Sequence, residues 1–193
     1  HSADAFRYFL IRESPYGSDL AFSEDALILR QNADLCDTLG NLVHRATVLC
    51  GKDCDGQVPA CGAEPIIDVG ELRRATMEAF QNHALSTAFE PAMRALAVAN
   101  KWVTDQEPWK LPAGDSRRAT AVRTLLEVVY AAAHFLQPLL VDGMLRIFSK
   151  LGTPPVPLPR LSARLDNLRP GTPIVVGEIL YVKAESAEAK ARM

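Results

Sequence analysis

The sequence has few aromatic residues, few cysteines and no long uninterrupted apolar run. Aromatic residues make up 7% of the 193 residues, and there are four cysteines. The longest apolar stretch, residues 125–141, is broken by Glu127, His134, Gln137 and Pro138. A membrane-spanning helix needs ~20 mostly apolar residues, so we expect no membrane segment. No basic-then-apolar leader occurs, so we expect no secretory signal and a cytoplasmic protein.

The sequence also lacks the common catalytic signatures. It has no phosphate-binding loop, no Gly-x-Gly-x-x-Gly dinucleotide fingerprint and no Gly-x-Ser-x-Gly nucleophile motif. No Glu-x-x-His motif is present, so a helical bundle here would lack the ligands of a di-iron site. The four histidines are scattered along the chain. We therefore assign no catalytic residue within this sequence.

The cysteines favour inert thiols over a metal site. Cys50, Cys54 and Cys61, with His44 nearby, offer ligand types that zinc accepts, and a zinc site is the alternative interpretation. The sequence has no Cys-x2-Cys pair, however, which most structural zinc sites use. Cys36 and Cys50 fall on the apolar side of a predicted helix, where a thiol packs as a small hydrophobic group. We predict reduced thiols and no metal.

Length and charge indicate one globular domain without strong electrostatic bias. The chain is 48% hydrophobic and carries a formal charge of −2, with an acidic first third and a modestly basic segment at residues 145–169. Such a balance argues against broad nonspecific nucleic-acid binding but permits a local basic surface. The first residue is His1 instead of Met, so we expect a chain that was processed, tagged or cut from a longer one.

Hydrophobic periodicity predicts an all-α protein, an antiparallel bundle of about five helices. Ser23, followed by two acidic residues, is a strong helix start, and Asp115 is another. A short helical segment is predicted at residues 4–13, and the five bundle helices at residues 24–49, 71–85, 87–104, 115–137 and 138–151. A Gly- and Pro-containing loop spans residues 51–70, and a Pro-rich connector begins at residue 153. Residues 174–182 resemble a short extended tail, which we expect to need a further domain as its docking surface.

Two groups of residues carry a more specific signal. Asn41 and Arg45 lie four apart on the predicted long helix, on the face opposite its core stripe, where an amide and a guanidinium can contact a base edge or a phosphate. Trp109 follows Pro108 just after another helix, and it is either an apolar plug for the bundle end or a platform for an unstacked base. Asn100, on the apolar face of that helix, is expected to tie helices together.

Taken in order, these motifs resemble those of the anticodon-binding domain of methionyl-tRNA synthetases. The sequence Asn-Leu-Val-His-Arg at 41–45 is followed by Asn-x-x-Val-x-Asp-x-x-Pro-Trp at 100–109. Further segments that resemble the family are residues 4–10, 12–19, 32–35, 39–42, 136–140 and 151–152, so the resemblance covers about residues 3–182. It implies that Asn41, Arg45 and Trp109 contact the anticodon of tRNA(Met). Basic residues that could attract the tRNA backbone are Lys110, Arg117, Arg118 and Arg123.

The resemblance also implies a division of the chain and a missing part. Residues 1–22 correspond to a region that links to the catalytic domain, residues 23–152 to the anticodon-binding bundle, and residues 153–193 to a connector and a tail that folds back. The family's His-Ile-Gly-His and Lys-Met-Ser-Lys-Ser signatures are absent. Methionine-tRNA ligase activity, with ATP and magnesium, would therefore belong to a catalytic domain outside this sequence. The family's metal knuckle would lie there too.

Two alternative functions remain open at this stage. The first is a helical protein-interaction or scaffold domain that binds no RNA; it predicts a large exposed apolar patch. The second is the anticodon domain of a related class I synthetase for another amino acid. Neither alternative, nor the main interpretation, involves DNA or a membrane as a partner.

Overall fold

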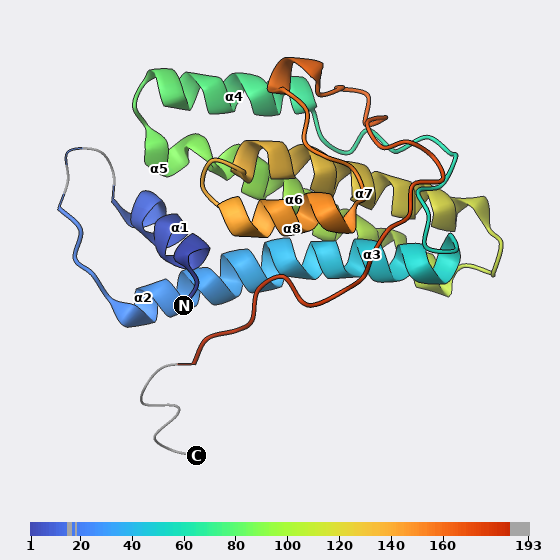
Figure 1. Cartoon of the computed structure of the whole chain (residues 1–193), viewed down its shortest axis with the longest axis horizontal. Coiled ribbons are helices and arrows are strands. Elements are labelled where there is room, and N and C mark those ends of the chain that lie inside the picture. Colours follow the sequence, from blue (N-terminus) through green and yellow to red (C-terminus); the bar gives the residue numbers. More distant parts are fainter. Residues whose placement is uncertain (15–16, 18, 186–193) are drawn as a thin grey trace.

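The computed structural model describes residues 1–14, 17 and 19–185 (Figure 1). In that part of the chain there is no β-strand, only one isolated bridge between Gln57 and Pro173. The all-α prediction is therefore confirmed. The helices are α1 (Ala3–Glu13), α2 (Glu24–Arg30), the π-helical η1 (Gln31–Gly40), α3 (Asn41–Asp53), α4 (Val69–Gln81), α5 (Leu85–Ala88), α6 (Glu90–Gln106), the 3-10 turn η2 (Pro108–Lys110), α7 (Ser116–Leu136), α8 (Val141–Lys150) and the 3-10 turn η3 (Leu158–Arg160).

The predicted first long helix is present, but its middle is wound differently from the prediction. The segments α2, η1 and α3 follow one another as a single rod along one side of the molecule (Figure 1). Ser23 caps the start, and its Oγ accepts a hydrogen bond from the Ala26 amide. The amide of Asn41 donates to the carbonyl of Cys36, five residues back, which is the π-helical pattern. The helix continues past Gly51 and ends at Asp53.

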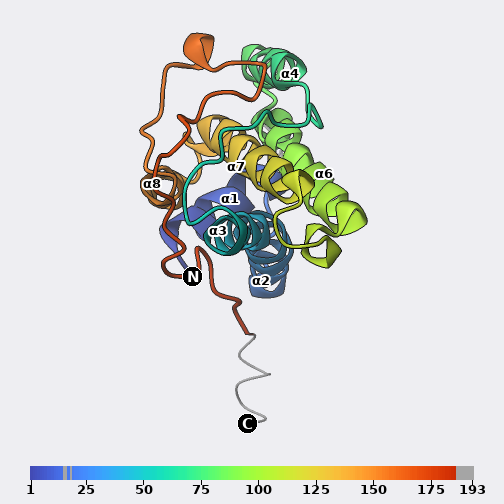
Figure 2. The same ribbon diagram turned by 90° about the vertical axis from the view of Figure 1, so that its right-hand side faces the viewer.

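Helix α7 is the centre of the bundle. Figure 2 shows it surrounded by α3, α4, α6 and α8, and it packs against each of them. Every residue from 121 to 136 is buried. By length and composition alone this helix could cross a membrane, yet most of it is buried inside the structure. Packing within the bundle thus accounts for its apolar surface.

A buried carboxylate joins α1 to α8 and to the C-terminal tail. Asp4 is 1% exposed. Its Oδ2 accepts hydrogen bonds from the amide of Gly143 at 2.7 Å and from the hydroxyl of Tyr181 at 3.1 Å. The contact satisfies an amide in the first turn of α8 and places a negative charge at the positive end of that helix. A Cβ atom at position 143 would overlap the Tyr181 hydroxyl, which explains the glycine.

The C-terminal tail packs on the bundle of this same chain. Leu180 and Tyr181 are 4% and 8% exposed. The side chain of Gln31 donates to the carbonyl of Val182 at 2.8 Å, and Arg146 donates to the carbonyl of Leu180 at 2.8 Å. Our expectation that this tail needs a further domain as its docking surface was therefore wrong, because η1 and α8 supply that surface. The division at residues 22 and 152 stays a prediction.

A buried histidine holds the Pro-rich connector onto the bundle. His134 Nδ1 lies 2.8 Å from the carbonyl oxygen of Tyr130, and its Nε2 accepts a hydrogen bond from the Val156 amide at 3.0 Å. The ring is therefore neutral, with the proton on Nδ1. Burial lowers the pKa of His134 below its ordinary value of 6.5.

The neutral, buried ring of His134 predicts that the free energy of unfolding decreases as the pH is lowered. The unfolded chain binds a proton at His134 more readily than the folded chain, so the contribution is complete above about pH 6.5 and is lost as the pH falls toward the folded pKa. We expect the free energy of unfolding to drop as the pH falls below about 6.5, by no more than about 1.4 kcal/mol for each pH unit from this residue alone. Urea titrations of wild type, His134→Gln and the exposed-site control His44→Gln would measure it. If the free energy of unfolding of His134→Gln depended on pH as strongly as that of wild type, the assignment of this effect to His134 would be contradicted.

Candidate nucleic-acid interface

The structure brings the predicted tryptophan and arginine together at one end of the bundle. The guanidinium carbon of Arg45 lies 5.4 Å from the ring centroid of Trp109, a distance at which a cation is attracted to the face of an indole. Trp109 is 39% exposed, so it is not an apolar plug. One residue comes from α3 and the other from η2, two segments that are remote in the sequence.

A rigid turn positions Trp109. Glu107 adopts a left-handed conformation with φ of 44° and ends α6. Pro108, which is buried, then fixes the backbone at the start of η2, and the amide of Lys110 donates to the carbonyl of Glu107 at 2.8 Å. Because proline and a short 3-10 turn leave little backbone freedom, the backbone that carries the indole is fixed before any ligand arrives.

Asn41 lies beside this pair and is exposed. Its Nδ2 donates to Oδ1 of Asn100 on α6 at 3.2 Å. Asn100 in turn donates from Nδ2 to the carbonyl of Thr38 in η1 at 2.9 Å. Asn100 therefore ties α6 to η1, as its position on the apolar face predicts, and it also orients Asn41.

Arg45 is oriented by α6 as well. Its guanidinium donates to Thr104 Oγ1 at 3.1 and 3.2 Å and to the carbonyl of Asn100 at 3.4 Å. Burial lowers the pKa of Arg45, although a guanidinium stays charged at neutral pH. The role of Thr104 was not predicted from the sequence. The signal that could have found it is the spacing of Asn100 and Thr104, which puts both on one face of α6.

The neighbouring cations are less available than the sequence suggested. Lys110 pairs with Glu107 at 2.7 Å, Arg117 pairs with Asp115 at 2.7 Å, and Arg118 pairs with Asp53 at 2.6 Å. Lys110 and Arg117 are exposed and their ion pairs are weak in water, so both can exchange partners. The side chain of Arg118 is only 11% exposed and links α7 to the end of α3.

The prediction that Arg123 attracts the tRNA backbone was wrong. It is 4% exposed, and its guanidinium is 2.9 Å from the buried carboxylate of Glu127. It also donates to the carbonyls of Leu168 at 2.8 Å and Pro59 at 3.1 Å. From this position the side chain cannot reach an RNA backbone. The prediction counted a charge without recognising that this side of α7 is covered by the loop at residues 54–68 and by the connector.

The cysteines occupy structural positions. Cys36 and Cys50 are buried, as their helical spacing predicted, and the Cys50 thiol donates to the carbonyl of Gln57 at 3.3 Å. Burial raises the pKa of Cys50 to about 12 and that of Cys54 to about 11, so both thiols are protonated at neutral pH. Within the described ranges, no group of three or more His, Cys, Asp or Glu side chains is arranged to hold a metal ion.

Two known family models match this chain. Residues 64–192 match the family model described as the anticodon binding domain of methionyl tRNA ligase. Residues 1–47 match the model described as class I tRNA synthetases (M). The first match includes Asn41 and Arg45, and the second includes Trp109.

Similar proteins are found in several bacteria. The methionine--tRNA ligase of Mycobacterium tuberculosis is 35% identical across 79% of this chain, and that of Brucella suis is 33% identical across 80%. This chain spans 31% of the length of each. Among solved structures, the free methionyl-tRNA synthetase of Mycobacterium tuberculosis superposes with a TM-score of 0.82 at 30% identity, covering 95% of this chain and 39% of that one. This chain therefore belongs to the methionyl-tRNA ligase family and contains its anticodon-binding domain.

Proposed function

We propose that this chain binds the anticodon loop of tRNA(Met). The observation that carries the proposal is the preformed cluster of Asn41, Arg45 and Trp109, in which a half-exposed indole on a rigid turn lies beside a guanidinium and an exposed amide. An anticodon loop presents unstacked bases, and proteins recognise such bases by stacking on aromatic side chains and by hydrogen bonds to their edges.

Each member of the cluster has a distinct part in this binding. The indole of Trp109 offers a flat surface, on which one base contributes ~1–3 kcal/mol. Arg45 keeps donors that Thr104 and Asn100 do not occupy, because a guanidinium has five N–H groups in a planar fork. The amide of Asn41 retains both a donor and an acceptor for a base edge. Affinity would then come mainly from base contacts, with a smaller contribution from Lys110 and Arg117, whose exposed ion pairs can exchange partners.

The longer enzyme would attach methionine to tRNA(Met) using ATP with magnesium, in the cytoplasm. This chain contributes anticodon recognition, which places the distant acceptor end of the tRNA in a catalytic domain outside the sequence described here. We assign no residue of this chain to methionine, ATP or magnesium. The region up to residue 22 would face that catalytic domain.

A binding comparison tests the proposal directly. The affinity of this chain is measured for a hairpin RNA with the methionine anticodon and for the same hairpin with its anticodon exchanged. We expect at least tenfold tighter binding to the methionine hairpin, because losing one good base contact costs ~1–3 kcal/mol. Equal affinity for both hairpins would reject anticodon recognition, and no binding to either would favour a scaffold domain.

Replacement of Arg45 with alanine should weaken recognition without unfolding the protein. Its hydrogen bonds to Thr104 are exposed and contribute little to stability, so we expect a loss of less than about 1 kcal/mol in the free energy of unfolding. The affinity for the methionine hairpin should fall by about tenfold. Thermal melting and RNA titration of the same sample would measure both quantities. A large drop in melting temperature would show that Arg45 is structural.

A further inference from the structure

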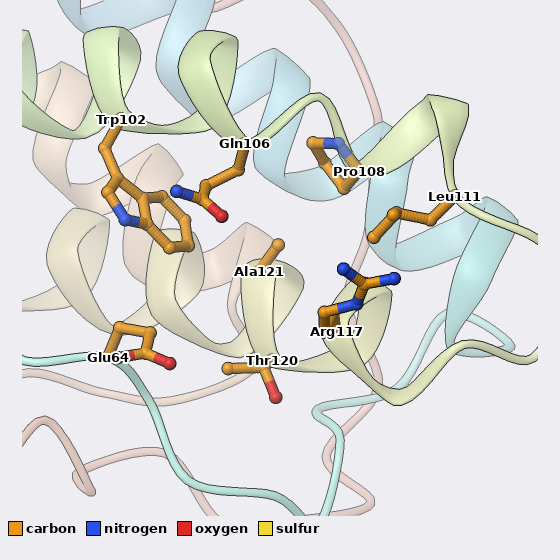
Figure 3. A pocket seen from close by; sticks show the side chains of 8 residues that line it. All are labelled: Glu64, Trp102, Gln106, Pro108, Leu111, Arg117, Thr120 and Ala121. Atoms are coloured by element: carbon orange, nitrogen blue, oxygen red, sulfur yellow. The ribbon is translucent and has the colours of Figure 1, made fainter.

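A pocket lies next to the Pro108 turn, on a different side of α6 from the cluster of Asn41, Arg45 and Trp109. It has a volume of about 170 Å³ and opens between α6, the start of α7 and the loop that contains Glu64 (Figure 3). Trp102 and Gln106 line it from α6. At about 100° per residue, these two side chains lie roughly 200° around the helix from Asn100 and Thr104. The pocket is therefore separate from the cluster of Asn41, Arg45 and Trp109, although Pro108 borders both.

The walls of this pocket combine a flat aromatic surface with free polar groups. Trp102 is half-buried and presents its indole to the space (Figure 3). The amide of Gln106 and the carboxylate of Glu64 form no hydrogen bond or ion pair with any described residue, and both are exposed at the mouth. An aromatic face with unpaired donors and acceptors beside it is suited to a planar heterocycle with polar edges.

The size and charge of the pocket limit which ligands it can bind. Pockets for drug-sized ligands measure ~300–1,000 Å³, so this one admits a single ring system and not a whole nucleotide. A carboxylate such as Glu64 accepts hydrogen bonds from the exocyclic amino group of a base, whereas it repels a carbonyl oxygen. Arg117, an exposed cation paired with Asp115, lines the same pocket and could contact a phosphate group next to a bound base.

We propose that this pocket binds one further unstacked base of the anticodon loop, a base with an exocyclic amino group. This inference rests on the proposed function. The Pro108–Lys110 turn separates the pocket from the indole of Trp109, so nucleotides that are close in the RNA would splay to the two sides of the turn. The base would stack on Trp102, with its amino group directed to Glu64 and its remaining edge to Gln106.

Abasic hairpins test this proposal. The methionine hairpin is prepared with an abasic nucleotide at each loop position in turn, and the affinity of each is measured for wild type, Gln106→Leu, Glu64→Gln and Trp102→Leu. We expect one loop position, different from the one that depends on Trp109, at which base removal weakens wild type by about five- to a hundredfold. At that position the Gln106→Leu and Trp102→Leu variants should lose no further affinity. Placing uracil there should weaken wild type more than it weakens Glu64→Gln.

The controls separate this inference from the proposed function. Lys101→Gln, an exposed change on α6 outside the pocket, should bind every hairpin as wild type does. Gln106 and Glu64 are exposed, so their variants are expected to fold even if Trp102→Leu does not. If pocket variants bind all hairpins like wild type while Trp109→Ala does not, the pocket has no RNA role and the proposed function stands. If anticodon exchange has no effect on wild type, the proposed function itself fails.

Discussion

Replacement of Glu127 with alanine is expected to lower the free energy of unfolding by about 3–5 kcal/mol, a large part of the 5–15 kcal/mol typical of a domain. Glu127 is fully buried, and it accepts hydrogen bonds from the Asn167 and Leu168 amides at 3.0 and 2.8 Å. Its removal would also leave the guanidinium of Arg123 buried without a countercharge. Urea unfolding followed by circular dichroism would measure the loss.

Two further variants serve as controls for the Glu127→Ala measurement. Glu78→Ala removes an exposed ion pair with Arg74 and should cost less than about 1 kcal/mol. The double variant Arg123→Met, Glu127→Leu replaces the buried pair with apolar groups, and it should recover part of the loss, because a buried pair is costly to break but less costly to replace. A loss below about 1 kcal/mol for Glu127→Ala would show that this buried network does not hold the loop and connector onto α7.

Replacement of Trp109 with alanine is expected to weaken binding of the methionine hairpin by more than tenfold. The change removes both the stacking surface and the contact with Arg45. Because Trp109 is partly exposed and lies on a turn outside the main core, the bundle should remain folded. In an enzyme that joins this chain to a methionyl-tRNA ligase catalytic domain, charging efficiency, kcat/KM for tRNA, should fall by a similar factor while methionine activation is unchanged.

A matched variant distinguishes stacking from a general loss of structure. Trp109→Phe keeps an aromatic face and should retain more affinity than Trp109→Ala, and the double variant with Arg45→Ala should be less than additive because the two side chains are in contact. Unchanged affinity or charging in Trp109→Ala would reject the role given to this residue.

Much of the fold and of the candidate interface follows from local patterns in the sequence. Ser23 and Asp115 cap helices as predicted, because a side-chain oxygen at those positions accepts a hydrogen bond from an amide of the first turn. Asn41 and Arg45 lie on the face predicted from their spacing. Leu35, Leu39 and the other core residues of the long helix are buried because they repeat with the helical period.

The features that were missed depend on contacts between remote segments. The π-helical η1 accepts a hydrogen bond from Asn100 at Thr38, and the tail near Tyr181 approaches it at Gly40. The position of Asn100 predicts that it joins helices, but neither the π-helical winding nor the contact with the tail has a local signature. The burial of Arg123 depends on the loop and connector that cover α7. The ion pair of Arg123 with Glu127 could nevertheless be predicted from the sequence, because Glu127 follows four residues later within an apolar run.

The continuous rod formed by α2, η1 and α3 connects two distant parts of the molecule. At ~1.5 Å per residue, α2 and α3 alone span roughly 30 Å, and η1 lies between them. The first turns of the rod contact α1, while Arg45 on its second half contacts Trp109. A continuous helix of this kind keeps the distance between its two ends nearly constant. The position of Arg45 relative to α1 is therefore set by this one helix, including the π-helical turns of η1.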